Sequence, residues 1–245
     1  MTEAHVVAVI QARTGSSRLP GKVLRLLGGR PVLGWMVRAA RAAQGVDDVV
    51  IATSTEEGDD AVARLGEELD VRVVRGSEDD VLSRFALAQA ETGADAVVRL
   101  TADCPLADPS LISKVVAVWR SEPGLDYVAT TLVRTLPRGL DVELVSKEAL
   151  AVADAEAEDY HRTHVTSYLY AGPRRFRTMG LVVQPPANDL RVTLDTLQDA
   201  EALDAMVAEL GDRPPAWHEI VGLLRSRPDI VHINADVKQK ALGDG

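Results

Sequence analysis

The sequence predicts a three-layer α/β protein, in which a mostly parallel sheet lies between two layers of helices. From residue 6 to residue 120, short apolar runs typical of buried strands alternate with longer segments of helical periodicity. Each apolar run is followed by polar or charged residues, as expected where the carboxyl ends of parallel strands meet at one site. With 245 residues, 46% of them hydrophobic, the chain can bury the core of one such domain.

The first eight elements follow one another in strict alternation. Strands are predicted at 6–10, 49–52, 71–74 and 96–100, and helices at 31–44, 58–69, 80–90 and 109–120. Pro31 and Pro109 stand at helix starts, where a backbone N–H has no partner within the helix anyway. Because strand–helix–strand units join parallel strands through right-handed crossovers, these elements predict a parallel sheet.

The alternation stops after Asp126. Further strands are predicted at 127–131, 139–145 and 176–183, and helices at 147–157 and 161–170. A strand at 190–194 is expected to return to the sheet, followed by helices at 196–210 and 214–224 and a short apolar segment at 230–233. We interpret residues 1–245 as one domain with a small inserted lobe at about 130–188, which contacts an acceptor or a second subunit.

A basic loop, residues 11–22 (QARTGSSRLPGK), follows the first predicted strand. Residues 4–46 hold seven Lys and Arg and no Asp or Glu, in a protein of net charge −10. Such a concentration of positive charge in an acidic chain indicates a local anionic ligand rather than a broad nucleic-acid surface. Gly15 and Gly21 let the backbone bend, and successive N–H groups around Ser16 and Ser17 favour an anion nest. Three cations suit a polyphosphate: Arg13, Arg18 and Lys22.

The loop matches neither common phosphate-binding pattern. Counted from Gly15, the second glycine of a Walker A motif falls at Pro20, and Val23 stands where that motif has a hydroxyl residue after the lysine. The glycine spacing of the dinucleotide fingerprint is also absent.

Two aspartates end predicted strands at the same edge of the sheet: Asp103 follows 96–100, and Asp195 follows 190–194. Mg²⁺ usually takes one or two carboxylates, with waters and substrate phosphates completing its octahedron. Taken alone, an aspartate at a strand end is more often a helix cap or a turn residue than a metal ligand. The basic loop at the same edge favours the metal.

The loop QARTGSSRLPGK resembles the signature of the cytidylyltransferases that activate sugars as CMP derivatives. The resemblance is closest to the spore-coat polysaccharide type and more distant to CMP-Kdo and CMP-sialate synthetases. RLTADCP (99–105) and RVTLDTLQD (191–199) resemble the two metal segments of that family, and RGSEDDVLSRF (75–85) resembles the segment beside the base. PRGLDVE (137–143) and HRTHVT (161–166) resemble segments near the acceptor, although Thr163 stands where relatives commonly have Glu.

The resemblance implies a Rossmann-like nucleotidyltransferase (GT-A-like) fold, Mg²⁺ as cofactor and a homodimer. It implies catalytic roles for Arg13, Lys22, Asp103 and Asp195, the two aspartates being the metal ligands. Nucleotide binding is expected from Gln11, Ala12, Arg13, Gly15, Ser16, Lys22, Thr53, Arg75, Thr101 and Asp103. Acceptor binding is expected from Arg138, Glu143, Arg162 and His164.

In the implied reaction, an acceptor oxygen attacks the α-phosphorus of CTP in line and pyrophosphate leaves. The acceptor is expected to be a sugar or sugar acid, with a phosphonate or another small anion as the alternative. A metal-dependent glycosyltransferase would carry an Asp-x-Asp motif, but Pro105 stands two residues after Asp103. A non-catalytic nucleotide-binding scaffold is the third hypothesis.

The remaining composition points to a cytoplasmic protein. No apolar stretch approaches the ~18 residues of a membrane span, and no secretory signal precedes the first strand. The single cysteine, Cys104, excludes a disulfide within the chain, and it is expected to be a small buried residue rather than a nucleophile. We therefore expect neither a membrane nor a nucleic-acid partner.

Overall fold

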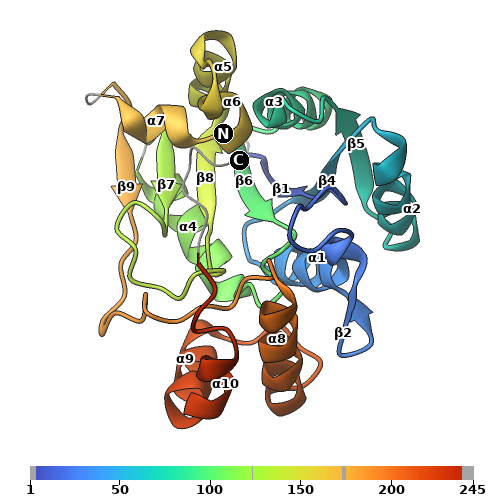
Figure 1. Ribbon diagram of the computed structural model, residues 1–245. Coiled ribbons are helices and arrows are strands. Elements are labelled where there is room, and N and C mark those ends of the chain that lie inside the picture. Colours follow the sequence, from blue (N-terminus) through green and yellow to red (C-terminus); the bar gives the residue numbers. More distant parts are fainter. Residues whose placement is uncertain (1–3, 123, 173–174, 239–245) are drawn as a thin grey trace.

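One seven-stranded sheet, in the order β5-β4-β1-β6-β8-β7-β9, organises the chain in a computed structural model that describes residues 4–122, 124–172 and 175–238 (Figure 1). The strands are β1 (Val6–Gln11), β4 (Asp48–Ser54), β5 (Arg72–Gly76), β6 (Ala96–Thr101), β7 (Tyr127–Ala129), β8 (Glu143–Ser146) and β9 (Thr178–Gly180). Four of the strand pairs are parallel, whereas β8 runs antiparallel to both of its neighbours.

Helices cover both faces of this sheet, so the predicted three-layer α/β class is confirmed. Figure 1 shows α1 and α8 on one side of the sheet and α3 and α5 on the other. The α-helices are α1 (Val32–Ala42), α2 (Asp60–Glu68), α3 (Val81–Thr92), α4 (Pro109–Ser121), α5 (Lys147–Glu156), α6 (Tyr160–His164), α7 (Ser167–Ala171), α8 (Leu197–Leu210), α9 (Trp217–Ser226) and α10 (Pro228–Ile233).

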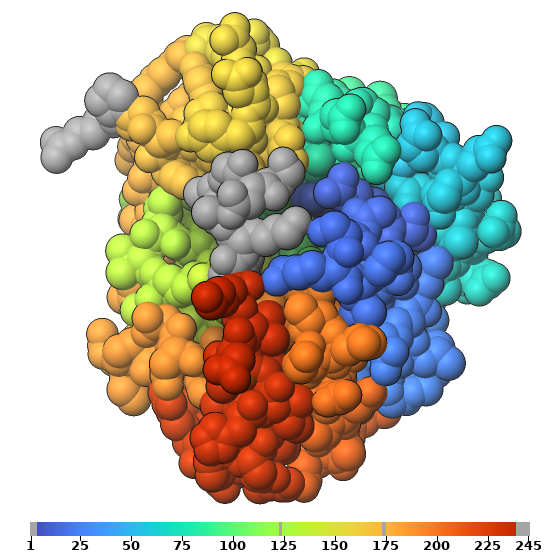
Figure 2. Space-filling view, in the orientation of Figure 1, coloured from blue at the N-terminus to red at the C-terminus, as the bar shows by residue number. Residues whose placement is uncertain are grey.

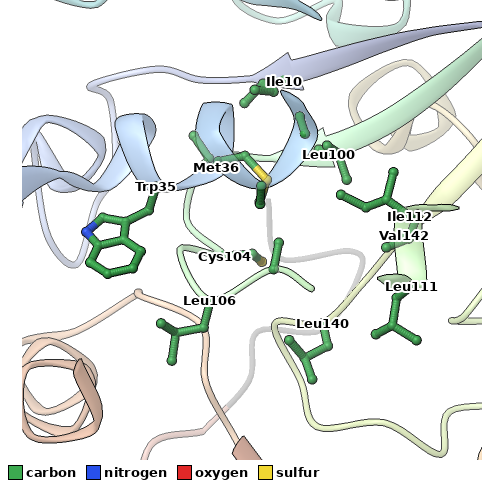
Figure 3. Packing of buried hydrophobic residues seen from close by; sticks show 14 of the residues in the cluster. Ile10, Trp35, Met36, Leu100, Cys104, Leu106, Leu111, Ile112, Leu140 and Val142 are labelled. Carbon is green, nitrogen blue, oxygen red and sulfur yellow. The ribbon is translucent and has the colours of Figure 1, made fainter. Parts of the chain in front are cut away.

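The two layers arise from the alternation of side chains along each strand. In β1, Ala8 and Ile10 pack with α1, α4 and α8, whereas Val7 and Val9 pack with α3 and α5. All four side chains are 0% exposed, which explains why the strand is apolar throughout rather than alternating. Figure 3 shows the first of these layers around Ile10, with Cys104 lying among apolar side chains.

The eight elements predicted up to residue 120 are all present, with ends within a few residues of the prediction. The predicted strand at 190–194 is wrong. The sheet position next to β6 is taken by β8, so this segment stays outside the sheet, and among the residues that the structure describes its one bridge joins Arg138 and Arg191. Its backbone is held by loops instead: the Leu194 N–H donates to the Asp103 carbonyl at 2.8 Å.

Other boundaries in the second half also differ. The predicted helix at 161–170 is two short helices, α6 and α7, because Val165 lies between them with φ of 56°. The strand predicted at 139–145 is shorter and begins later, as β8 (Glu143–Ser146), and the 230–233 segment belongs to helix α10. The prediction also missed a hairpin of β2 (Leu26–Leu27) and β3 (Arg30–Pro31), although the Gly28–Gly29 pair between them signals such a turn.

No helix in the described part of the chain is long and apolar enough to cross a membrane.

Candidate active site

A cleft of about 230 Å³ lies at the carboxyl ends of β1 and β6. It combines the basic loop with Asp103 and Asp195 of the two predicted metal segments, which lie 195 − 103 = 92 positions apart in the sequence. Its lining consists of Gln11, Arg13, Gly15, Ser16, Ser17, Arg18, Lys22, Val23, Thr101, Ala102, Asp103 and Asp195. Open α/β sheets bind ligands at this edge.

The conformation of the loop is fixed by Thr14 and Asp59. The Thr14 carbonyl accepts from the N–H of Ser16 at 2.8 Å and of Gly21 at 2.9 Å, so both ends of the loop turn around one oxygen. The buried Asp59 accepts from the Thr14 N–H at 2.7 Å and its hydroxyl at 2.8 Å. Gly21 has a φ of 69°, which favours glycine. The curved loop therefore keeps its shape without a ligand.

Lys22 lies between the two aspartates. Its Nζ is 2.7 Å from Asp103 Oδ2 and 2.7 Å from Asp195 Oδ1, and the lysine is only 9% exposed. Burial by itself lowers the pKa of Lys22, but the two carboxylates outweigh it and hold that pKa above its ordinary value. The structure therefore brings the loop, Asp103 and Asp195 together, with the Lys22 ammonium group between the two carboxylates.

Asp195 is held from its other side by two arginines. Its Oδ2 accepts from Arg191 at 2.8 Å and lies 3.1 Å from Arg18. Burial opposes its ionisation, but Lys22 and Arg191 keep the pKa of Asp195 below its ordinary value. Asp199, which is 0% exposed, holds Arg191 in turn and caps α8 through Thr196. Asp199 therefore positions Arg191 and Asp195 and does not face solvent.

The donor set fits a hard divalent cation such as Mg²⁺. The carboxylate oxygens of Asp103 and Asp195 face the cleft and are the kind of ligand atom that such a cation prefers. The Lys22 ammonium group lies between them, at hydrogen-bond distance from both, so the space between them accommodates a positive charge. Among residues 4–122, 124–172 and 175–238 there is no cluster of three or more His, Cys, Asp or Glu that would form a complete protein cage. An ion there would take its remaining ligands from water and substrate phosphates, which is the usual arrangement for Mg²⁺.

Four of the seven N-terminal cations serve the fold instead of the cleft. Arg30 and Arg38 both pair with Asp212, at 3.2 Å and 2.7 Å. Arg25 lies 3.6 Å from Asp204, and Arg41 donates to backbone carbonyls after α2. The contacts of Arg25, Arg30 and Arg38 join the N-terminal region to α8 and the segment after it, whose orange surface lies against the blue N-terminal segment in Figure 2. The other three cations, Arg13, Arg18 and Lys22, line the cleft.

Three residues expected to bind the nucleotide do not line the cleft. Ala12 is 2% exposed, and its N–H continues the sheet by donating to the Ala52 carbonyl. Thr53 is 0% exposed on β4. Arg75 is already occupied, because its guanidinium donates to the Ser54 and Glu56 carbonyls and lies 2.7 Å from Asp60.

The residues expected near an acceptor also lie outside the lining of the cleft. Glu143 is 6% exposed and bonds to Arg99, Tyr127 and Thr166. Burial opposes its charge, but Arg99 and these hydrogen bonds hold the pKa of Glu143 below its ordinary value. Its carboxylate is thus fully engaged inside the protein.

The other residues expected to bind the acceptor, Arg162, His164 and Arg138, differ in the contacts of their side chains. Arg162 is bound to Asp80 at 2.5 Å and to Asp154 at 2.9 Å. The His164 ring lies 6.1 Å from that of Tyr160. The Arg138 guanidinium has no hydrogen bond or ion pair within the described ranges, while burial and Arg134 lower its pKa. The Arg138 guanidinium is therefore available to bind an anionic ligand.

Two residues that the sequence did not single out, Val23 and Ala102, also line the cleft. Ser17 and Arg18 of the predicted loop line it as well, and Arg18 connects it to the C-terminal segment by donating to the Lys238 carbonyl at 3.0 Å. The charge of Arg18 and its place in the loop can be recognised from the sequence. Its contact with Lys238, 220 positions away, cannot be predicted from the sequence.

Cys104, next to Asp103, is 5% exposed and lies near Met36, Leu106 and Leu140 (Figure 3). Burial and the neighbouring Asp103 raise the pKa of its thiol well above the ordinary value. The thiol is therefore not activated as a nucleophile, in agreement with the sequence prediction.

A basic loop at the end of the first strand faces Asp103 at the end of β6 and Asp195 on a segment beside the sheet, which is the arrangement expected of a nucleotidyltransferase. Comparison with known proteins makes the class narrower. A protein-family model described as Cytidylyltransferase matches residues 7–220, and the chain therefore belongs to the cytidylyltransferase family.

Three similar proteins illustrate the family. The spore coat polysaccharide biosynthesis protein SpsF of Bacillus subtilis is 35% identical over 233 residues, which is 91% of this chain and 95% of SpsF. A 3-deoxy-manno-octulosonate cytidylyltransferase of Maricaulis maris is 36% identical over 130 residues, 52% of this chain and 49% of that protein. The solved structure of a cytidylyltransferase from Leptospira borgpetersenii has a TM-score of 0.90 and 26% identity, and the match covers 98% of this chain and 100% of that one.

Proposed function

We propose that this cytidylyltransferase is Mg²⁺-dependent and transfers CMP from CTP to a small acceptor of the sugar or sugar-acid class, with release of pyrophosphate. The observation that carries the proposal is the contact of Lys22 with both Asp103 and Asp195 in the cleft under the basic loop. The acceptor class is supported by the names of two relatives, one acting in spore-coat polysaccharide biosynthesis and one on 3-deoxy-manno-octulosonate.

The loop would bind the triphosphate. Lys22, Arg18 and Arg13 line the same cleft as the backbone of Gly15 and Ser16. Their charges would neutralise the phosphates and stabilise the charge that collects on the leaving pyrophosphate. When Lys22 turns to a phosphate, it releases the two carboxylates with which it pairs in the free protein.

Asp103 and Asp195 would then hold the metal. Bound there, Mg²⁺ neutralises phosphate oxygens and favours attack at the α-phosphorus. The new bond joins the acceptor oxygen to that phosphorus, the bond to the β-phosphate bridging oxygen breaks, and the acceptor proton passes to solvent. Arg191 and Asp199 keep Asp195 oriented during this step.

The proposal also includes an acceptor site and an assembly. The Arg138 guanidinium has no ion pair or hydrogen bond in residues 4–122, 124–172 and 175–238, and it suits the carboxylate of a sugar acid or a phosphonate equally. Exposed apolar side chains gather in the proposed 130–188 lobe, including Val133 and Val182 at 59% and 54% exposure, and we propose this lobe as the contact of a homodimer.

The test is pyrophosphate release with Mg²⁺, each nucleoside triphosphate in turn, and a panel of sugars, sugar acids and phosphonates. Release with CTP and one class of acceptor is expected, together with its loss when EDTA removes the metal. Turnover with a phosphonate but with no sugar or sugar acid would show that the acceptor is a phosphonate and would overturn the proposed acceptor class. Absence of stabilisation by any triphosphate, measured as the melting temperature, would refute the nucleotide site itself.

A further inference from the structure

Asn234 connects the segment after helix α10 to the residues that hold Asp195. It follows α10 directly and is only 6% exposed. Its side-chain Nδ2 donates to Asp199 Oδ1 at 2.9 Å, although the two residues are 35 positions apart in the sequence. Asparagine is mostly a surface residue, and a buried amide is normally hydrogen-bonded. The burial of Asn234 is therefore explained by the carboxylate that it contacts.

The Asp199 carboxylate accepts hydrogen bonds at both of its oxygens. Oδ2 accepts from the N–H groups of Asp195 and Thr196, both at 3.0 Å. Oδ1 accepts from Arg191 Nε at 2.8 Å and from Asn234. Asp199 is 0% exposed, and burial opposes its charge, but Arg191 and Asn234 hold the pKa of Asp199 below its ordinary value. Asn234 thus helps to keep this carboxylate ionised and fixed in one orientation.

Asp199 fixes Asp195 by two routes. It accepts from the Asp195 N–H, and it pairs with Arg191, whose Nη2 donates to Asp199 Oδ2 at 2.9 Å and to Asp195 Oδ2 at 2.8 Å. The backbone and one carboxylate oxygen of Asp195 are therefore both held from Asp199. The other oxygen, Oδ1, lies 2.7 Å from Lys22 Nζ in the cleft. A shift of Asp199 would therefore change where Asp195 Oδ1 lies in the cleft.

The segment after α10 reaches Asp195 by a second contact. The Lys238 carbonyl accepts from Arg18 Nη1 at 3.0 Å, and Arg18 Nη2 lies 3.1 Å from Asp195 Oδ2. The Val237 N–H donates to the Asn234 carbonyl at 3.1 Å, which turns the chain between the two contacts. This segment therefore approaches Asp195 from two sides.

Helix α10 anchors this segment to the core. Its Ile230 is 1% exposed and lies in the same apolar cluster as residues of α8, the helix against which α10 packs. Asp199 lies in the first turn of α8, so Asn234 and its acceptor are attached to two helices that pack together. Asn234 also lies beyond residues 7–220, which the family model matches. The contact therefore belongs to a part of the chain that this model does not cover.

We propose that Asn234 is a positioning residue for the reaction, which orients Asp195 through Asp199 and touches neither substrate nor metal. The inference rests on the proposed function, in which Asp195 is a metal ligand. A ligand whose orientation is already fixed binds a metal more tightly, and loss of a side chain that holds such a ligand typically lowers metal affinity about 10–100-fold. Asn234 acts one hydrogen bond further away, so we expect its loss to lower the affinity about three- to tenfold.

The experiment measures the Mn²⁺ affinity of the full-length, nucleotide-free protein by electron paramagnetic resonance, in the wild type and in Asn234→Leu. The variant keeps a branched side chain but removes the donor to Asp199. Its Mn²⁺ dissociation constant is expected to rise about three- to tenfold. In pyrophosphate release, the Mg²⁺ concentration that gives the half-maximal rate should rise by a similar factor.

Ile230→Val is the matched control. It shortens a buried apolar side chain of α10 and leaves the amide of Asn234 in place, so it weakens the packing of the same helix without removing the hydrogen bond. Its Mn²⁺ affinity should equal that of the wild type. An equal loss of affinity in Ile230→Val and Asn234→Leu would show that Asn234 only supports α10, and would overturn the inference.

A double variant tests the route. Because Asn234 acts through Asp199, adding Asn234→Leu to Asp199→Asn should change the Mn²⁺ affinity by less than about twofold, whereas full additivity would overturn the inference. Unchanged Mn²⁺ affinity in folded Asn234→Leu would overturn it as well. Should that variant fail to fold, Asn234→Ala, which removes the donor without added bulk, is held to the same expectation. Failure of the proposed function is distinct, because the wild type would then neither bind Mn²⁺ nor release pyrophosphate.

Discussion

Lys22 Nζ lies 2.7 Å from Asp103 Oδ2, and the same ammonium bridges to Asp195. The lysine thus stands where a divalent cation between the two carboxylates would stand. Its charge offsets the mutual repulsion of the two carboxylates, and in the proposed function the same charge would also serve the triphosphate. Metal and nucleotide are therefore expected to bind together.

Lys22→Met tests this coupling. Without the ammonium, the two aspartates repel each other and Mn²⁺ relieves that repulsion, so Mn²⁺ is expected to bind the nucleotide-free variant about tenfold more tightly, roughly 1.4 kcal/mol. Turnover should fall about 10²–10³-fold, because a charge contact to the leaving group is lost. Electron paramagnetic resonance of free Mn²⁺ measures the affinity. Lys147→Met, which breaks the surface pair with Asp95, is the control, and equal Mn²⁺ binding by both variants would contradict the coupling.

Asp103→Asn and Asp195→Asn are both expected to abolish turnover, but they should differ in stability. Asp103 is paired through Lys22, which keeps Asp195 as a partner in the variant. Asp195→Asn weakens the contacts of Arg18 and Arg191 as well, at a cost of about 1–3 kcal/mol. Urea unfolding and pyrophosphate release measure the two effects. Asp204→Asn, at a surface pair, is the control, and wild-type turnover in either active-site variant would remove that residue from the metal site.

Asp59 should make the stability of the loop depend on pH. Burial opposes its charge, but hydrogen bonds from Ser54 and Thr14 hold the pKa of Asp59 below its ordinary value of 3.8. A depressed folded-state pKa contributes stability that is present above the unfolded value and is lost as the pH falls through the folded value. Asp59→Asn should therefore be less stable than the wild type at about pH 6, and the gap should narrow below about pH 4.

The difference in stability is obtained from the unfolding free energies of wild type and Asp59→Asn. They are measured from about pH 2.5 to about pH 7, which covers the range in which carboxylates titrate. Asp60→Asn is the control, because Asp60 is adjacent but half-exposed and pairs with Arg75 at the surface. A constant gap across the pH range would show that the Asp59 carboxylate is not what holds Thr14.

Gly139→Ala is expected to separate the two segments that place Asp195. Gly139 has φ of 104°, and an added Cβ would lie 2.7 Å from the Thr193 backbone nitrogen. The backbone conformation alone costs about 1–3 kcal/mol. The clash adds to it and pushes away the segment that carries Asp195, so CTP turnover should fall together with stability.

Gly29→Ala distinguishes the cost of the backbone conformation from the effect of the clash. Gly29 also has positive φ, at 81°, but no atom lies within 4 Å of its added Cβ. It should lose stability through the backbone alone and keep its turnover. Equal loss of turnover in both variants would mean that close contact between Gly139 and Thr193 has no part in placing Asp195.

The fold class and most of the cleft follow from the sequence alone. Apolar runs such as 6–10 are buried on both faces of a parallel sheet, and this requirement is local enough to read from composition and spacing. The basic loop is contiguous in the chain, so its glycines and cations can be recognised from the order of the residues. Asp103 and Asp195 can be recognised in the same way, because each belongs to a motif.

Which polar groups have partners, by contrast, depends on the tertiary structure. Nothing local shows that β8 takes the place next to β6 and keeps 190–194 out of the sheet, because strand order depends on pairings between distant segments. The same holds for Arg75 and Arg84: both lie in one motif, yet the first is satisfied by Asp60 and backbone carbonyls, while the second is buried without an acceptor among the described residues. Hydrogen-bond satisfaction depends on the geometry of the whole fold, and the spacing of residues does not encode it.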